Sequence, residues 1–177
     1  MVVMNEIEAI SHLDYLRKAI EIVKLNRITM SQIAKDEKAT WMGIIITGIS
    51  GALVFISGSD LSEIILGAAY SVVAIFAFAG LVHIMSVYSM NTKEFMGFFR
   101  VNALAGILDW ACVIPVIGWI VSLWGIPIAI VSAEEVYGLT RKRSTVIVLV
   151  SVLILWVITF AIFTGPLSQD NQILLGY

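Results

Sequence analysis

Long uncharged stretches, separated by short clusters of charge, dominate the chain after residue 40. Residues 41–59 carry no charge, and residues 64–92 carry none apart from the titratable His83. A helix rises about 1.5 Å per residue, so roughly 20 apolar residues cover a hydrocarbon core of about 30 Å. The pattern therefore predicts two membrane-crossing helices, over about 41–59 and 64–90, joined by a short acidic turn.

The next apolar stretch, residues 101–133, contains a single formal charge, Asp109. One continuous helix of this length would measure roughly 50 Å, which is too long for one crossing. Pro115 and Gly118 interrupt the stretch, because proline removes a helical donor and glycine permits a turn. We predict two helices, over about 97–114 and 117–137, joined by a tight hairpin. A re-entrant hairpin that enters and leaves on one side is the alternative.

A fifth apolar stretch, over 144–164, completes an all-α prediction: a polytopic membrane protein whose transmembrane domain, residues 41–165, is a five-helix bundle. Residues 1–40 are predicted to form a cytoplasmic amphipathic arm, because apolar positions recur there at three- and four-residue spacing among basic residues. Such an arm can lie on an anionic membrane, pack beneath the bundle or bind a partner helix. Residues 166–177 are predicted to form a short extracytoplasmic tail.

The distribution of charge sets the orientation of the predicted bundle. All 11 lysines and arginines fall on one side of the five-span arrangement, and the opposite side has none. Because basic residues prefer the cytoplasmic side, we expect the N-terminus in the cytoplasm and the C-terminus outside. A hydrophobic content of 59%, a charged content of 14% and a mean hydropathy of +0.96 exclude an ordinary soluble domain.

Polar side chains inside the predicted spans are the first candidates for function. A charge in hydrocarbon costs several kcal/mol unless it faces the bundle interior, pairs or takes up a proton. Asn102, Gly106 and Asp109 fall on one helical face, and His83 has a similar setting in the second span. A histidine and an aspartate could form a hydrogen-bonded or proton-exchanging pair. The alternative is that each side chain only satisfies buried polar groups.

A second group of polar candidates lies at the cytoplasmic mouth, where the fourth span ends. Carboxylates are unfavourable at a helix C-terminus, so we expect Glu134 and Glu135 to pair with cations across the following loop. A divalent cation or a substrate at this mouth is the alternative. The candidates here are Glu134, Glu135, Tyr137, Arg141, Lys142 and Arg143.

Small residues at helical spacing predict close packing of two spans against their neighbours. They are Gly43, Thr47 and Gly51 in the first span, and Gly118, Ser122, Gly125 and Ala129 in the fourth. The chain has a single cysteine, Cys112, and lacks a nucleophile elbow, phosphate loop, HExxH, CxxC or paired histidine ligands. We therefore expect no enzyme activity, cofactor or metal, and no basic patch is large enough to predict nucleic-acid binding.

The order of features over residues 95–150 carries a family resemblance. An FxxxxR segment leads into a helical hairpin, and the next helix ends in Glu-Val-Tyr-Gly-Leu, residues 135–139, before a basic loop and an apolar span. With KLNRITMSQIAKDEKATW ahead of the first span, this order resembles the Yip (Ypt-interacting protein) domain family, in a compact prokaryotic-type form, over roughly residues 20–165. The resemblance implies a five-helix bundle with a cytoplasmic N-terminus and brings no catalytic residues. Eukaryotic members are associated with Rab-type GTPases and vesicle traffic.

Two functions follow from these features. The favoured one is a non-catalytic membrane scaffold or adaptor in membrane organisation or trafficking. Its expected partners are the lipid bilayer, further copies of the chain and a cytoplasmic protein bound through the arm. The alternative is a small ion or solute channel or transporter that uses His83 and Asp109 in the membrane and Glu134 and Glu135 at the cytoplasmic mouth. Five spans leave little room for a pathway in one protomer, so transport would favour an oligomer.

Overall fold

Every regular element in the part of the chain that the structure describes is a helix. In this computed structural model of the whole chain, the described residues are 2–56, 60–87 and 95–164. The elements are α1 (Val2–Val23), α2 (Arg27–Lys35), α3 (Ala39–Phe55), α4 (Leu61–Val87), α5 (Phe95–Ala105), the 3-10 helix η1 (Gly106–Val113), α6 (Pro115–Tyr137) and α7 (Arg141–Thr164). The predicted all-α fold class is therefore confirmed.

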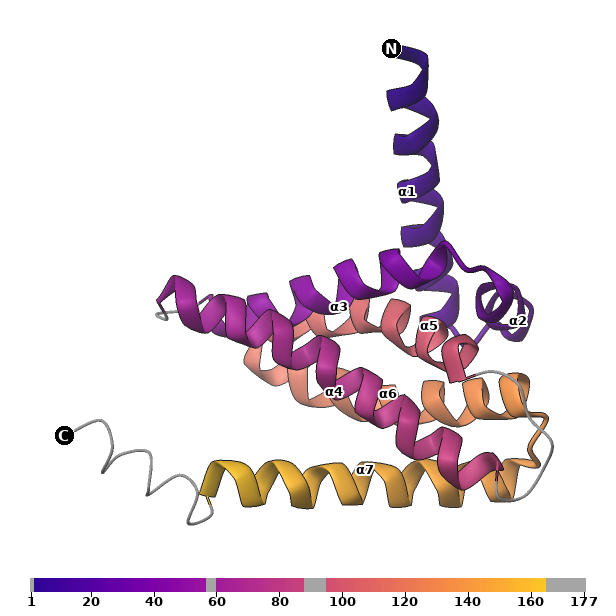
Figure 1. Cartoon of the computed structure of the whole chain (residues 1–177), viewed down its shortest axis with the longest axis vertical. Coiled ribbons are helices and arrows are strands. Elements are labelled where there is room, and N and C mark those ends of the chain that lie inside the picture. Colours follow the sequence, from indigo (N-terminus) through magenta and orange to yellow (C-terminus); the bar gives the residue numbers. More distant parts are fainter. Residues whose placement is uncertain (1, 57–59, 88–94, 165–177) are drawn as a thin grey trace.

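Helices α3 to α7 share one broad direction, although α4 is inclined to α7 in Figure 1, and α1 runs across them. Helix α3 packs against α4, α5 and η1, while α6 packs against η1, α5 and α7. Helix α2 and the turn between α6 and α7 lie at the same end of this bundle, which we call the α2 end. The arm predicted over residues 1–40 thus sits at one end of the helices that follow it.

In the described part of the chain, two helical segments are long and apolar enough to cross a membrane: Leu61–Ser86 in α4 and Arg141–Ala161 in α7. Helix α3 contains a shorter apolar segment, Ala39–Val54. Core helices of soluble proteins share this length and composition, but they are mostly buried. Only 11% of the α4 window and 22% of the α7 window are buried inside the structure. Their exposed apolar side chains form a large surface of the kind that lipid or a protein partner covers.

The apolar stretch from 101 to 133 is broken at the predicted position. Ile114 has an extended backbone (φ −97°, ψ 108°), and α6 starts with Pro115 in its first turn. The proline ring disfavours helix in the residue before it, and its fixed φ suits the start of the next helix. Helix α6 then ends at Gly138, which adopts the left-handed conformation (φ +62°) that glycine favours at a helix end.

The prediction of one α-helix over 97–114 is wrong in its second half. The α-helix ends at Ala105 and continues as the 3-10 helix η1. Two hydroxyl groups of α3 donate to backbone carbonyls at this junction: Thr47 Oγ1 to Ala103 O at 3.0 Å, and Ser50 Oγ to Gly106 O at 2.7 Å. Side chains that engage the carbonyl ladder in this way change the local helical geometry.

Helix α7 begins at Arg141, before the predicted start at residue 144, so the basic cluster lies in its first turn rather than in a loop. The arm likewise differs from a single amphipathic helix. Leu25 has a positive φ of 63° after α1, and the Asn26 side chain then caps α2 by accepting from Thr29 N. The predicted tail, residues 166–177, lies outside the described residues.

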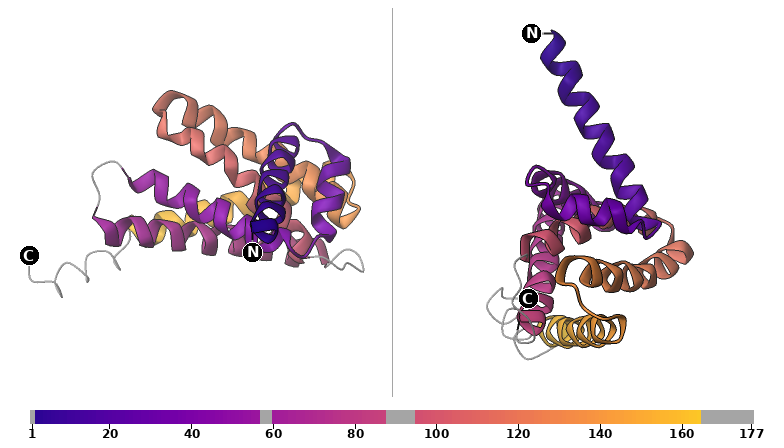
Figure 2. Two further views of the ribbon diagram at one scale, coloured as in Figure 1. Left: turned by 90° about the horizontal axis from the view of Figure 1, so that it is seen from above. Right: turned by 90° about the vertical axis from the view of Figure 1, so that its right-hand side faces the viewer.

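The second half of α1 is docked on the bundle. Tyr15, Ala19 and Ile22 are buried in one apolar cluster with side chains of α3, α5 and α6. The Tyr15 hydroxyl donates to Asp36 Oδ2 at 2.7 Å, which fixes α1 to the segment between α2 and α3. The first half of α1 extends beyond the other helices (Figures 1 and 2).

This docking is expected to weaken at high pH. Burial, the hydrogen bond to Asp36 and the charge of Asp36 raise the pKa of Tyr15 from 10.0 to about 12. The folded state therefore holds the Tyr15 hydroxyl proton more tightly than the unfolded state does. The resulting contribution to the free energy of unfolding is complete below pH 10 and is lost as the pH rises towards 12. Thermal unfolding of wild type and Tyr15→Phe over this range measures the effect. Lysines titrate in both proteins, so the comparison cancels their effect. If the melting temperature fell equally steeply with pH in both proteins, that would contradict a role for Tyr15.

Candidate functional site

A cavity of about 680 Å³ lies among α4, α5, η1, α6 and α7. Its wall is mainly apolar and includes the aromatic side chains of Phe78 and Trp156. Polar groups also reach it, among them Thr47 of α3 and Ser71 of α4. Ligand pockets typically measure about 300–1,000 Å³ and combine an apolar wall with a few polar groups, so this cavity is the principal candidate site.

The structure brings together three residues that the sequence placed on one helical face. Asn102, Gly106 and Asp109 all line the cavity. Asn102 is buried, and its side-chain amide donates to Phe98 O of its own helix at 2.9 Å. Asp109 is exposed and is the one formally charged residue among the described lining residues. It forms no ion pair with any residue that the structure describes.

Small residues of α3 and α6 differ in what surrounds them. A Cβ atom added at Gly43 would come within 2.8 Å of the Ala103 Cβ, so the predicted close packing of α3 is confirmed there. A Cβ atom added at Gly125 would meet nothing within 4 Å, and Gly125 lines the cavity. The predicted packing role of Gly125 is therefore wrong, because the cavity occupies the space that a neighbouring helix would fill.

Two further lining residues connect the helices on the α4 and α7 side of the cavity. The hydroxyl groups of Tyr70 in α4 and Thr159 in α7 lie 3.2 Å apart and share a hydrogen bond. Neither residue was predicted as a site residue. Hydroxyl-bearing residues are common in apolar helices, so their sequence positions alone do not indicate that they face each other.

His83 does not line the cavity. Its ring packs against Phe95 and Tyr137, with centroids 5.8 Å away in each case. The Nδ1 atom of His83 is buried and has no hydrogen-bond partner among the described residues. His83 and Asp109 therefore do not form the suggested pair.

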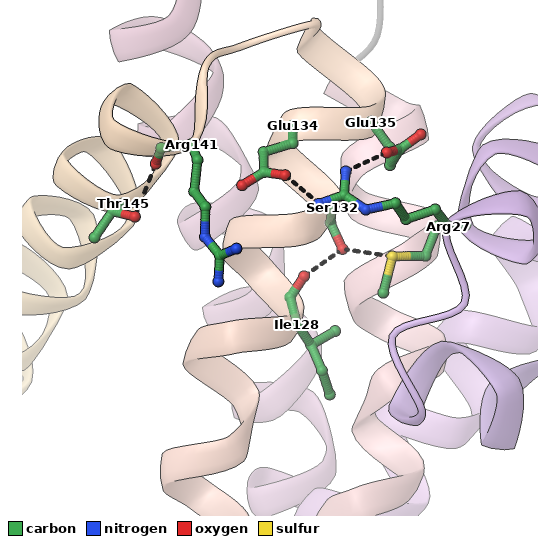
Figure 3. Close-up of polar contacts among 8 residues, drawn as sticks. Arg27, Ile128, Ser132, Glu134, Glu135, Arg141 and Thr145 are labelled. Atoms are coloured by element: carbon green, nitrogen blue, oxygen red, sulfur yellow. Dashed lines mark hydrogen bonds and ion pairs between the residues drawn. The ribbon is translucent and has the colours of Figure 1, made fainter.

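Glu134 and Glu135 are paired with Arg27, from the start of α2 (Figure 3). The Arg27 Nη2 atom lies 2.5 Å from Glu134 Oε2, and Nη1 lies 2.5 Å from Glu135 Oε1. The hydrogen bonds to both carboxylates raise the pKa of Arg27. A planar guanidinium can engage two carboxylates at once, so this arginine joins the arm to the end of α6.

The prediction that Glu134 and Glu135 pair with the basic cluster across the loop is therefore wrong. Arg141, Lys142 and Arg143 are exposed in the first turn of α7 and form no ion pair with a described residue. Helix α2 lies beside the carboxylates instead, and its Arg27 forms the ion pairs with them. No group of three or more histidine, cysteine or acidic side chains that could hold a metal occurs among the described residues.

Four buried polar atoms have no hydrogen-bond partner among the described residues. They are His83 Nδ1, Glu134 Oε1, Tyr137 Oη and Ser144 Oγ. The rings of His83 and Tyr137 are in contact, and Glu134 precedes Tyr137 by about one turn of α6. Buried polar groups are normally paired, so each of these four atoms is a candidate contact for a water molecule or a ligand. Sequence reasoning singled out three of the four residues but missed Ser144.

Within the described residues, the fold is all-helical, two helices are long and apolar enough to cross a membrane, and a mainly apolar cavity carries one carboxylate on its wall. Comparisons of the chain with protein-family models, with curated proteins and with solved structures find no match.

Proposed function

We propose that the protein is an integral membrane protein with five membrane-crossing segments and a cytoplasmic N-terminus, and that it acts as a non-catalytic scaffold or adaptor of the Yip type. The observation that carries this proposal is the arm, which is fixed to the bundle at α2 and stands away from it over the first half of α1 (Figures 1 and 2). A projecting helix that is anchored at its base offers a partner an accessible surface.

Polar contacts hold the arm in place in addition to the Arg27 pairs. Arg100 of α5 donates to Ala34 O at 2.8 Å and to Thr40 Oγ1 at 2.9 Å, which fixes the end of α2 and the start of α3. Trp124 of α6 donates to Val23 O, the last residue of α1, at 2.9 Å. Each of these contacts joins the arm to a helix of the bundle, so the arm and the bundle support each other.

The five crossings are proposed for α3, α4, α5 with η1, α6 and α7. Their broadly shared direction and the exposed apolar surfaces of α4 and α7 support this placement. The turn between α6 and α7 lies at the same end as α2, so the basic residues of the arm and of the first α7 turn share one end of the bundle. That end suits the cytoplasmic face.

Cysteine labelling tests the crossings. In a Cys112→Ser background, a membrane-impermeant maleimide added outside sealed vesicles should label Asp60→Cys and Ile114→Cys. It should label Lys38→Cys and Lys142→Cys only after the vesicles are opened. Protection of Ile114→Cys in sealed vesicles would instead support a re-entrant hairpin, and outside labelling of Lys142→Cys would contradict five crossings.

Transport is the second candidate function, and Asp109 on the cavity wall is the observation that favours it. Ion and proton flux into liposomes that contain the purified protein separates the two functions. A scaffold should give no flux above empty liposomes. Flux that is lost in Asp109→Asn but kept in His83→Ala would overturn the scaffold proposal, because His83 lies outside the cavity.

A further inference from the structure

The charge of Asp109 has no counterpart among the residues that the structure describes. The nearest arginine along the sequence, Arg100, is engaged with Ala34 and Thr40. Arg27 is engaged with Glu134 and Glu135. No lysine, arginine or histidine is among the described residues that line the cavity.

Asp109 lies on a mainly apolar wall, where an ionised carboxylate is stabilised by a cation that comes close to it. The other residues of the cavity wall indicate which further chemical groups such a cation must have. Most of the cavity is lined by aliphatic and aromatic side chains, and Gly125 leaves its part of the wall open. A small hydrated metal ion would gain nothing from these surfaces. The aromatic side chains of Phe78 and Trp156 are part of this wall, and an organic cation or an apolar body can contact such side chains favourably.

We propose that the cavity binds a cationic amphiphile, an organic molecule whose positive head pairs with Asp109 and whose apolar body lies between α4, α6 and α7. The carboxylate selects the charge of the ligand, and the apolar wall selects a hydrophobic body. The hydroxyl pair of Tyr70 and Thr159 provides hydrogen bonding at the α4 and α7 side. This inference goes beyond the scaffold role and does not depend on it.

Ethidium, an aromatic fluorescent cation, is a suitable probe. Its fluorescence anisotropy is titrated with the full chain in nanodiscs of zwitterionic lipid, with empty nanodiscs as the background. We expect saturable binding that weakens about tenfold or more in Asp109→Asn, which corresponds to a loss of about 1.4 kcal/mol of binding free energy. Equal binding to wild type and Asp109→Asn would overturn the proposal.

Two glycines provide a matched test of location. Gly125→Leu would place a side chain in the cavity and should abolish ethidium binding. A Cβ atom added at Gly80 would also meet nothing within 4 Å, but Gly80 does not line the cavity, so Gly80→Leu should bind as wild type does. Binding that survives Gly125→Leu would overturn the assignment to this cavity. Circular dichroism and size-exclusion chromatography establish that each variant is folded.

Competition on the wild-type protein needs no variant at all. Dodecyltrimethylammonium should displace ethidium, whereas dodecanol, which has the same chain without the charge, should not. Equal displacement by both would overturn the proposal, because the site would then select apolarity alone. A concentration-dependent dimer of wild type that is lost in Gly125→Leu would also overturn it, because a second copy of the chain would then fill the cavity.

Discussion

Replacing Arg27 with alanine is expected to loosen the N-terminal arm and to lower the free energy of unfolding by about 2 kcal/mol. The change removes two ion pairs and leaves the Glu134 side chain, only 9% exposed, without a cation. Loss of one partner from a buried pair costs about 3–5 kcal/mol, whereas exposed pairs contribute about 0–1 kcal/mol. The Arg27 side chain is 48% exposed, so the expected cost lies between these limits.

Thermal unfolding of the purified protein measures this cost, and Arg141→Ala is the matched control because Arg141 is exposed and forms no ion pair with a described residue. Adding Glu134→Gln to Arg27→Ala should restore part of the stability, since the uncompensated charge is then absent. Limited proteolysis near Leu25 should be faster in Arg27→Ala than in wild type. A stability loss no larger than that of Arg141→Ala would show that the pairs do not hold the arm.

The helices and the break at Pro115 could be predicted because their causes are local. A proline restricts the residue before it wherever the chain goes, and an uninterrupted apolar run favours a helix in apolar surroundings. The 3-10 geometry of η1 was not predictable in this way. It accompanies hydroxyl contacts from Thr47 and Ser50, which are 56 residues away from the carbonyls they engage.

The candidate site was predictable only in part for the same reason. Asp109 and Asn102 are visible as polar residues in an apolar run, but the spacing that favoured packing at Gly43 also favoured it at Gly125, where the structure has a cavity. Likewise, the need of Glu134 for a cation could be predicted, whereas the choice of Arg27 could not. The two residues are separated by 107 positions, and only the docking of α2 brings them together.

Gly51→Ala is expected to disrupt the packing of α3 against α4 more than alanine at Gly43 or Gly80 would. A Cβ atom at Gly51 would overlap the Ser71 side chain and the Gly67 backbone carbonyl of α4. A side chain could turn away, but a backbone carbonyl inside a helix cannot move without shifting the helix. Overpacking of this kind typically costs about 1–3 kcal/mol and occasionally more, and we expect the upper part of this range.

Three glycines of α3 and α4 form a graded series that isolates the cause. Gly43→Ala should cost less than Gly51→Ala, because the atom in the way is the Ala103 Cβ at 2.8 Å rather than a carbonyl. Gly80→Ala should be neutral or slightly stabilising, since its added methyl meets nothing within 4 Å and alanine favours helix. Thermal unfolding of all three variants in one membrane mimetic ranks their losses of stability. If Gly80→Ala lost as much stability as Gly51→Ala, the cost would come from helix backbone effects, and the close contact between α3 and α4 would not be its source.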